Sequence, residues 1–308
     1  MPYKKRGEPF HGWLVLDKPT HITSAKAVYA VREIFNGVKA GHAGTLDPLA
    51  TGILPIALGE ATKTVSYAMN SSKDYTLTVR WGEATTTDDA DGEIVETNEL
   101  RPDVTAILKI MNRFIGVIEQ VPPKFSAIKI NGERAYKLAR SGKEFNLKCR
   151  SINIIDLVLL DIPTRDEASF QVTSGNGAYM RSLARNLAQA LGTVGHMRNL
   201  RRLRVGPFCM NHAITLDQIK NSINKIHPSN YLLPIETALK NMPSLALQAA
   251  EAIRLSNGQG IPIHTLTDYS KLYQLQENDL IYVISNTIPI AIARIKDGTV
   301  RPVRVLKL

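Results

Sequence analysis

The sequence predicts an α+β fold in two domains, residues 1–242 and residues 243–308. Residues 73–81 alternate apolar and polar side chains, which is the pattern of a half-buried strand. Residues 179–191 carry the spacing of a helix and are followed by a glycine, so the first domain combines both element types. Beyond Pro243, short apolar runs are joined by Asn and Asp-Gly turns, which predicts a small, mostly β second domain.

Around that first strand, the chain is expected to alternate strands and helices. Residues 13–16 are an apolar run that predicts a strand. Thr23 or Ser24 supplies the hydroxyl cap of a helix that extends to about Phe35, because such a side chain accepts a hydrogen bond from the first helical turn. Two further helices are expected, at residues 60–69 and 104–115.

The rest of the first domain is expected to contain a hairpin and a second group of strands. Asn131-Gly132 predicts a tight hairpin turn, and the basic residues 196–204 predict a strand. The other elements expected in this domain are a strand at 125–130, a helix at 135–141 and strands at 152–162 and 169–173. In the second domain we expect a helix at 245–255 and strands at 280–285, 289–295 and 303–306.

The composition is that of a soluble globular protein. The 308 residues are 44% apolar and 21% charged, and no apolar run approaches the roughly 20 residues of a membrane span. The basic start MPYKKRGEPFHGW is not followed by an apolar core, so no signal peptide is expected. The two cysteines, Cys149 and Cys209, argue against a disulfide framework or a zinc cluster, and a reducing cytoplasm is the expected compartment.

The distribution of charge indicates a polyanionic partner. The formal net charge is +10, and a positive surface attracts phosphate chains. Residues 196–204, HMRNLRRLR, bring four arginines close together, and Lys4, Lys5 and Arg6 form a second basic group. Acidic residues gather elsewhere, at 83–99. This separation of sign favours a one-sided nucleic-acid face, with a solvated strand face as the alternative.

Several common catalytic motifs do not occur in the sequence. It has no CxxC pair, no HExxH helix, no GxxxxGK[ST] phosphate loop and no GxSxG elbow. The seven histidines show no metal-ligand spacing. If the protein is an enzyme, we therefore expect a reaction without metal or cofactor.

The stretch 41–63, GHAGTLDPLATGILPIALGEATK, gathers glycines and prolines around a single acid, Asp47. Such punctuation predicts a shaped loop. Because Leu46 and Pro48 flank the acid, the loop fits a held functional group, although an ordinary structural turn is an equal alternative. Arg181, near the start of its helix, could reach a buried carboxylate and keep it ionised, or could contact phosphate at the surface.

Four segments in the same order resemble the bacterial TruB-type tRNA pseudouridine synthases, over most of the first 210 residues. They are LDKPTHITS, the loop at 41–63, VPPKFSAIKINGERAYKLAR and SGNGAYMRSLARNLAQALG. Near the C-terminus, RLSNGQGIP is similar to the PUA-like domain of the bacterial members. The resemblance implies a pseudouridine synthase-like catalytic domain over residues 1–242, with a mixed, mainly antiparallel sheet and flanking helices, and a PUA-like RNA-binding domain over residues 243–308.

The resemblance also implies an activity: isomerisation of the T-loop uridine at tRNA position 55 to pseudouridine, by base flipping and without a cofactor. The implied partner is the T-arm of tRNA, with no membrane contact, and a monomer is expected. By this resemblance, Asp47 is the catalytic aspartate, Arg181 is its ion-pair partner and Tyr75 is the aromatic residue that stacks on the flipped base. The other implied contacts to RNA or to the pocket are His42, Tyr179, Leu200 and Lys18.

The sequence departs from the family pattern at three positions. Phe125 stands where the family often has Tyr, and Ala178 and Met180 replace the usual Thr and Ile before the arginine. These differences leave the detail of the pocket open but not the reaction.

Other interpretations of the same residues stay open. Taken alone, Tyr75 is a core residue, His42 a turn residue, Leu200 ordinary packing and Lys18 a solvated charge. A tRNA-binding protein without chemistry would explain the charge but not Asp47, because an acid in an RNA-facing loop repels phosphate. A carboxylate hydrolase would want a second acid, which the motif does not offer. For the isomerase, either Tyr75 or Asp47 could accept the C5 proton.

Overall fold

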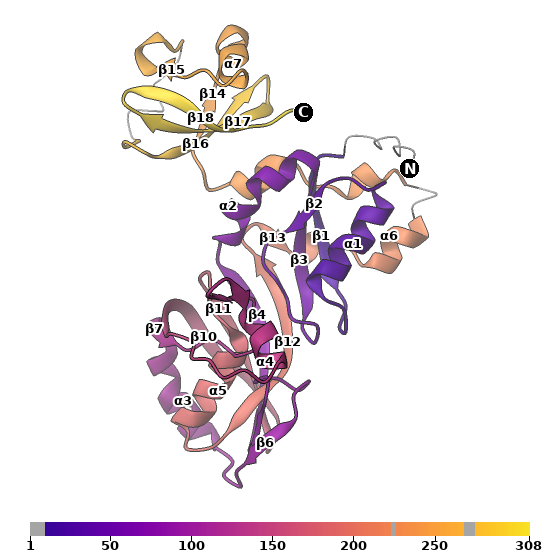
Figure 1. The fold of residues 1–308 in the computed structure, drawn as a ribbon, viewed down its shortest axis with the longest axis vertical. Coiled ribbons are helices and arrows are strands. Elements are labelled where there is room, and N and C mark those ends of the chain that lie inside the picture. Colours follow the sequence, from indigo (N-terminus) through magenta and orange to yellow (C-terminus); the bar gives the residue numbers. More distant parts are fainter. Residues whose placement is uncertain (1–9, 223–225, 268–274) are drawn as a thin grey trace.

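The computed structural model describes residues 10–222, 226–267 and 275–308. These residues contain one large β-sheet, one small β-sheet and two two-stranded hairpins, with flanking helices (Figure 1). Lys4, Lys5 and Arg6, which the sequence suggested as a second basic group, lie outside the described residues. Within the described ranges, none of the helices has the length and apolar character needed to cross a membrane.

The large sheet has nine strands and is mainly antiparallel, as expected. Its strands lie in the order β1 (Gly12–Lys18), β3 (Thr51–Leu58), β12 (Gly195–Val205), β4 (Lys73–Trp81), β11 (Glu167–Ser174), β10 (Arg150–Thr164) and β7 (Gly116–Gln120). The short strands β2 (Ala40–His42) and β13 (Phe208–Cys209) pair with β3 and β12. Only β3 and β12 pair in parallel among these described strands.

The helices flank this sheet. They are α1 (Ser24–Ile34), α2 (Val65–Met69), α3 (Val104–Met111), α4 (Ala135–Arg140), α5 (Met180–Ala190) and α6 (Leu216–Ser222). Thr23 caps α1, because its hydroxyl accepts the N–H of Lys26 at 3.1 Å. The helix α5 buries Leu183 and Leu187 and packs on β12. Figure 1 shows β12 and β4 running from the part that holds β1, β3 and α1 into the part that holds β10, β11 and α5.

Two hairpins extend from the large sheet. The first, β5 (Glu83–Thr85) with β6 (Ile94–Thr97), includes the acidic connection at residues 85–92. The second, β8 (Lys129–Ile130) with β9 (Glu133–Arg134), turns at Asn131 and Gly132, both with positive φ, as the Asn-Gly pair predicted.

The small sheet forms around its own apolar core. Its order is β14 (Ser244–Ala246), β16 (Leu280–Ser285), β17 (Ile288–Lys296), β18 (Thr299–Val305) and β15 (Ile261–Pro262), with α7 (Ala249–Ser256) packed against it. The chain then returns to the large body. Leu306 is buried in a core cluster with Trp13 and Phe208, and the N–H of Lys307 donates to Glu60 at 2.7 Å.

Four expected elements differ from the structure. The helix expected at 60–69 is a 3-10 helix over Gly59–Thr64, and only Val65–Met69 are α-helical. The helix expected at 104–115 ends at Met111 and is followed by a 3-10 turn, Asn112–Phe114, and by β7, which begins at Gly116 with a φ of 95°. The helix expected at 245–255 begins only at Ala249, because Ser244–Ala246 form β14 and alternate exposed and buried side chains. The strand expected at 125–130 is reduced to Lys129–Ile130.

Candidate active site

The Asp47 loop, residues 43–50, connects β2 to β3 and is braced by the chain between β1 and α1. Lys18 is fully buried, and its ammonium donates to the carbonyl oxygens of Pro19 at 2.8 Å, Ile22 at 2.9 Å and Pro48 at 3.3 Å. The buried hydroxyl of Ser24 both accepts from the N–H of Leu46 and donates to its carbonyl oxygen. Lys18 is therefore not a solvated charge but a support of this loop.

The structure brings Asp47 and Arg181 into direct contact, although 134 residues separate them in the chain. Nη2 of Arg181 donates to Oδ1 of Asp47 at 3.1 Å. Nε lies 2.9 Å from Oδ2, an ionic contact without hydrogen-bond geometry. The Arg181 side chain is 5% exposed and that of Asp47 33% exposed. The carboxylate is thus held by a buried guanidinium while one side stays open to solvent.

Arg181 is itself fixed by groups from two other loops. It donates to the carbonyl oxygens of Thr87 at 3.1 Å and Phe125 at 3.0 Å. Its Nε also lies 3.6 Å from the carboxylate of Asp89, whose side chain is 8% exposed. The backbone carbonyl of Phe125 makes this contact, so the departure from the family's Tyr leaves it unchanged.

Asp89 is a second acid at the site that the sequence did not reveal. Its carboxylate accepts hydrogen bonds from the hydroxyl of Thr87 and, at 3.2 Å, from the N–H of Asp91. In the sequence it is one of several acids in a polar connection, with no pattern that separates it from its neighbours. The structure therefore supplies the second acid that a hydrolase would want and that the sequence motif did not offer.

Burial and neighbouring charge act on Asp47 in opposite directions. Burial raises the pKa of the Asp47 carboxyl above its ordinary value, while Arg181 lowers it. Asp89 raises it further, and Lys18 lowers it. Burial also lowers the pKa of Lys18 to about 8, with the charge of Asp47 acting against this shift. The guanidinium is the strongest of the groups that favour the ionised carboxylate.

The negative charge of Asp47 acts on two tyrosines, Tyr75 and Tyr179, and favours the protonated form of both phenols. Tyr75 on β4 is 6% exposed and shares the buried face with Leu77 and Val79, so it is a core residue as well as a site residue. Tyr179 precedes α5 and is partly buried. Burial raises the pKa of both phenols.

The buried side chain of Gln120 fixes the start of α5 through the backbone of Tyr179. Its amide oxygen accepts the N–H of Tyr179 at 2.8 Å, and its amide nitrogen donates to the Tyr179 carbonyl at 3.1 Å. Arg181 lies two residues further on. Gln120 therefore helps to fix the backbone position from which the Arg181 side chain reaches Asp47. Sequence reasoning missed Gln120, which lies at the end of a strand it did not expect.

Leu200 and His42 border the loop differently. Leu200 is 7% exposed, pairs across the sheet with Leu77 and belongs to the same core cluster as Leu46 and Tyr75. His42 ends β2, and its buried Nδ1 has no hydrogen-bond partner among the described residues. Burial lowers the pKa of His42, so the neutral imidazole is favoured.

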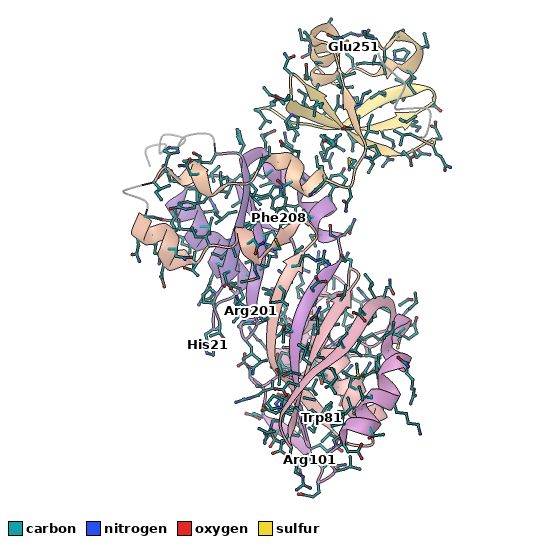
Figure 2. All side chains as sticks on the ribbon, turned by 180° about the vertical axis from the view of Figure 1, so that it is seen from behind. His21, Trp81, Arg101, Arg201, Phe208 and Glu251 are labelled. Carbon is teal, nitrogen blue, oxygen red and sulfur yellow. The ribbon has the colours of Figure 1, made fainter. Side chains whose placement is uncertain are left out.

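The arginines of β12 do not form the free cationic face that the segment 196–204 suggested. Arg201 pairs with Asp17 at 2.7 Å and Arg204 with Asp74 at 2.6 Å. Figure 2 shows Arg201 near the middle of the molecule, where the parts joined by β12 meet. Arg202 is buried and 1% exposed. Two of the four arginines are therefore paired with acids and a third is buried, so the segment does not present four free cations.

Unpaired positive charge gathers instead at residues 124–150. This segment has eight Lys and Arg residues against two Glu, and all eight basic residues are exposed. None of the eight forms an ion pair with another residue of the described chain. The segment begins beside the site, since Phe125 contacts Arg181 and the charge of Arg150 acts on Tyr179.

The described ranges contain no group of three or more His, Cys, Asp or Glu side chains placed to hold a metal ion.

Two family models match the chain. Residues 32–180 match the TruB family pseudouridylate synthase N-terminal domain, and residues 181–240 match the tRNA pseudouridylate synthase B C-terminal domain.

Curated relatives match over the whole length. The tRNA pseudouridine synthase B of Rhodospirillum rubrum is 48% identical over 308 residues, which cover 100% of both chains. That of Caulobacter vibrioides is 45% identical over 309 residues, again covering 100% of both chains. The enzyme of the same name from Ehrlichia canis is 44% identical and covers 97% of this chain and 98% of that one.

Solved structures share the fold at lower identity. An H/ACA RNP bound to a substrate RNA containing 2'-deoxyuridine contains a chain with a TM-score of 0.73 and 22% identity, covering 97% of this chain and 86% of that one. An archaeal box H/ACA sRNP Nop10-Cbf5 complex gives the same TM-score and identity over 98% and 88% of the chains. With full-length relatives at 45 to 48% identity, the chain belongs to the TruB family of pseudouridine synthases.

Proposed function

We propose that this protein is a tRNA pseudouridine synthase that isomerises the T-loop uridine at position 55. The observation that carries the proposal is the contact between Asp47 and Arg181, in which a buried guanidinium holds a partly open carboxylate within electrostatic range of two tyrosines. The names of the full-length relatives support the same substrate class.

In this proposal each site residue has one task. Asp47 is the catalytic carboxylate, Arg181 keeps it ionised, and Tyr75 stacks on the flipped base. Tyr179 and Leu200 line the pocket. His42 contacts the RNA beside the loop, and Lys18 supports the loop from below.

The chemistry follows from these parts. A uridine within a folded T-loop must leave its stack before its glycosidic carbon can be reached, at a cost of a few kcal/mol. As the N1–C1′ bond breaks, positive charge develops on the sugar, which an adjacent carboxylate stabilises or attacks. The base then turns and forms the C5–C1′ bond, C5 loses its proton to an acceptor, and N1 gains a proton. Atoms and charge balance without a second substrate.

The proposed RNA surface is the segment 124–150 together with residues 243–308, which we propose as a PUA-like RNA-binding domain. The segment approaches the site near Phe125, which contacts Arg181, and near Arg150, whose charge acts on Tyr179. Its exposed cations can therefore neutralise phosphates of an RNA bound at the site. Because the proposed substrate is tRNA, we also propose that the protein acts in the cytoplasm.

Asp47→Asn tests the chemistry. The variant is expected to bind a T-arm tRNA transcript normally but to release no tritium from C5-tritiated uridine, because the amide cannot stabilise the developing charge. Arg185→Met is a matched control on α5, since Arg185 pairs with Asp88 and not with Asp47. Full tritium release by Asp47→Asn would remove Asp47 from the mechanism.

Product analysis separates the competing functions. The wild-type protein should convert uridine to pseudouridine in intact RNA. Release of free uracil would instead identify a hydrolase that uses Asp89 as its second acid, and binding without either product would identify a tRNA-binding protein.

The RNA surface is tested by salt dependence. Replacing both Lys137 and Arg140 with Ala is expected to weaken tRNA binding and to lower the slope of log K against log salt by about 2, because two phosphate contacts are lost. An unchanged slope would place the RNA on another face.

A further inference from the structure

Arg202 is a buried cation whose place in the sheet joins two parts of the site. It lies on β12 between β3 and β4, directly opposite Gly52 on one side and Tyr75 on the other. It is 1% exposed, and no carboxylate of the described chain lies within ion-pair distance of its guanidinium. A buried charge of this kind is expensive unless its donors are fully used.

The guanidinium uses its donors on both ends of the Asp47 loop. Nε donates to the carbonyl oxygen of Ile53 at 2.7 Å, just after the loop, and Nη2 donates to that of Gly44 at 2.9 Å, near its start. Nη1 lies 3.5 Å from the carbonyl oxygen of Thr45. One side chain therefore fixes the distance between the two ends of the loop that carries Asp47.

Tyr75 is the direct partner of Arg202 in the pairing of β12 with β4. Burial raises the pKa of the Tyr75 phenol, and the charge of Arg202 acts against this shift. Arg202 thus holds the Asp47 loop and also favours negative charge on the phenol of its neighbour in the sheet.

A glycine lets β3 approach β12 closely beside the loop. A Cβ on Gly52, whose φ is 98°, would lie 2.1 Å from the Arg202 carbonyl oxygen. A Cβ on Gly44 would make only an ordinary contact of 3.4 Å with Nη1 of Arg202, but its φ of 101° favours glycine. The close backbone approach therefore requires glycine at position 52, and the left-handed turn favours it at position 44.

We propose that Arg202 is a positioning residue that couples the Asp47 loop to Tyr75, so that the carboxylate and the phenol keep one fixed relative placement. The inference rests on the proposed function for its catalytic readout. A fork of donors is required, because Nε holds Ile53 while Nη2 holds Gly44, and a lysine ammonium has no such planar spread.

The test uses Arg202→Lys in the full-length protein, with Arg198→Lys as the matched control. Arg198 lies on the same strand but is 52% exposed and makes only a 3.9 Å contact with Glu167. Arg202→Lys is expected to slow single-turnover tritium release by about 30-fold or more while tRNA affinity stays within about 3-fold, since placement and not binding is lost. Arg198→Lys should leave both unchanged.

A double-mutant cycle with Tyr75→Phe separates coupling from general loosening. If Arg202 acts through Tyr75, Arg202→Lys should slow the reaction only about 3-fold in the Tyr75→Phe background, because that partner is already absent. The same factor in both backgrounds would overturn the coupling. A rate for Arg202→Lys within about 2-fold of wild type would also overturn it. Failure of Arg202→Lys to fold would overturn it as well, because Arg202 would then have a structural role alone.

Hydrogen exchange gives a readout that does not depend on activity. Amides of residues 43–50 should exchange faster in Arg202→Lys than in Arg198→Lys, because the loop loses its anchor. If Arg202→Lys exchanges faster but the wild-type protein forms no pseudouridine, the proposed function is rejected while Arg202 remains an anchor of the loop. Unchanged exchange in Arg202→Lys would reject the role of Arg202 as an anchor.

Discussion

Removal of the Arg181 guanidinium is the most informative perturbation of the site. Arg181→Met keeps much of the side-chain volume but deletes both contacts to Asp47 and the contact to Asp89. It also leaves the carbonyl oxygens of Thr87 and Phe125 without this donor. Asp47 and Asp89 then lose the guanidinium that contacts both, and the charge of Asp89 disfavours the ionised form of Asp47.

The size of the effect follows from the geometry. Two unit charges 2.9 Å apart attract by about 6 kcal/mol at an effective dielectric constant of about 20. Because a third of the Asp47 side chain is exposed, solvent screening leaves about 3 kcal/mol, or about 100-fold. A misplacement of the freed carboxylate by about 1 Å adds about another 100-fold. We therefore expect Arg181→Met to slow the chemical step by about 10³- to 10⁴-fold.

The assay is single-turnover tritium release with protein in excess over tRNA, with Arg185→Met as the control on the same helix. Arg185→Met should stay within about 10-fold of wild type, because Arg185 does not touch Asp47. Asp89→Asn combined with Arg181→Met removes the second unpaired acid and should restore folding stability but not the rate. A folded Arg181→Met protein that reacts within about 10-fold of wild type would refute the reasoning.

The pH dependence has a definite sign. Burial raises the pKa of Asp47 in the folded protein, so the acid limb of the wild-type rate should lie above the ordinary range of an aspartate. Arg181 acts against this shift. Its removal should raise the pKa further, and the acid limb of Arg181→Met should move to higher pH. A limb that moves to lower pH would show that Arg181 does not stabilise the carboxylate.

Two stability predictions test the framework around the site, each read from chemical denaturation midpoints. Gly52→Ala should lower the free energy of unfolding by more than about 3 kcal/mol, because its Cβ would meet the Arg202 carbonyl oxygen at 2.1 Å. Gly37→Ala, at a φ of 77° with nothing within 4 Å of its Cβ, should lower it by only about 1 to 2 kcal/mol. Leu306→Ala should lose about 2 to 5 kcal/mol because Leu306 is buried, while Leu308→Ala, 55% exposed, should stay within about 0.5 kcal/mol. Equal losses within either pair would contradict these accounts.

Local signals in the sequence were enough for most elements of the fold. The alternation at residues 73–81 corresponds to β4, whose side chains alternate buried and half-buried along all of Lys73–Trp81. Thr23 caps α1 as its hydroxyl predicted. The errors lie where two signals compete within a few residues. Leu245 continues the apolar spacing of the helix that follows, whereas Leu245 and Leu247 together alternate as in a strand. Pairing with β16, far later in the chain, decides for the strand.

At the site, the sequence identified the residue types but not their partners. The glycines and prolines around Asp47 predicted a shaped loop, and the loop exists. The other residues of the site come from distant parts of the sequence. Arg181, Asp89 and Gln120 reach the site through contacts that no local pattern encodes. Sequence spacing describes one element, whereas a site depends on how several elements meet.

The arginines of β12 show why charge alone misleads. Four arginines in nine residues suggested a cationic face, yet a strand sends neighbouring side chains to opposite sides of the sheet. Arg201 therefore meets Asp17 on one side, while Arg202 enters the interior on the other. Register then places Arg202 opposite Tyr75 and Gly52, which turns a residue that looked like an RNA contact into an internal anchor of the Asp47 loop. A change of register by one residue would exchange these two arginines, so the pairing of β12 with β3 and β4, and not its composition, decides which of them serves the site.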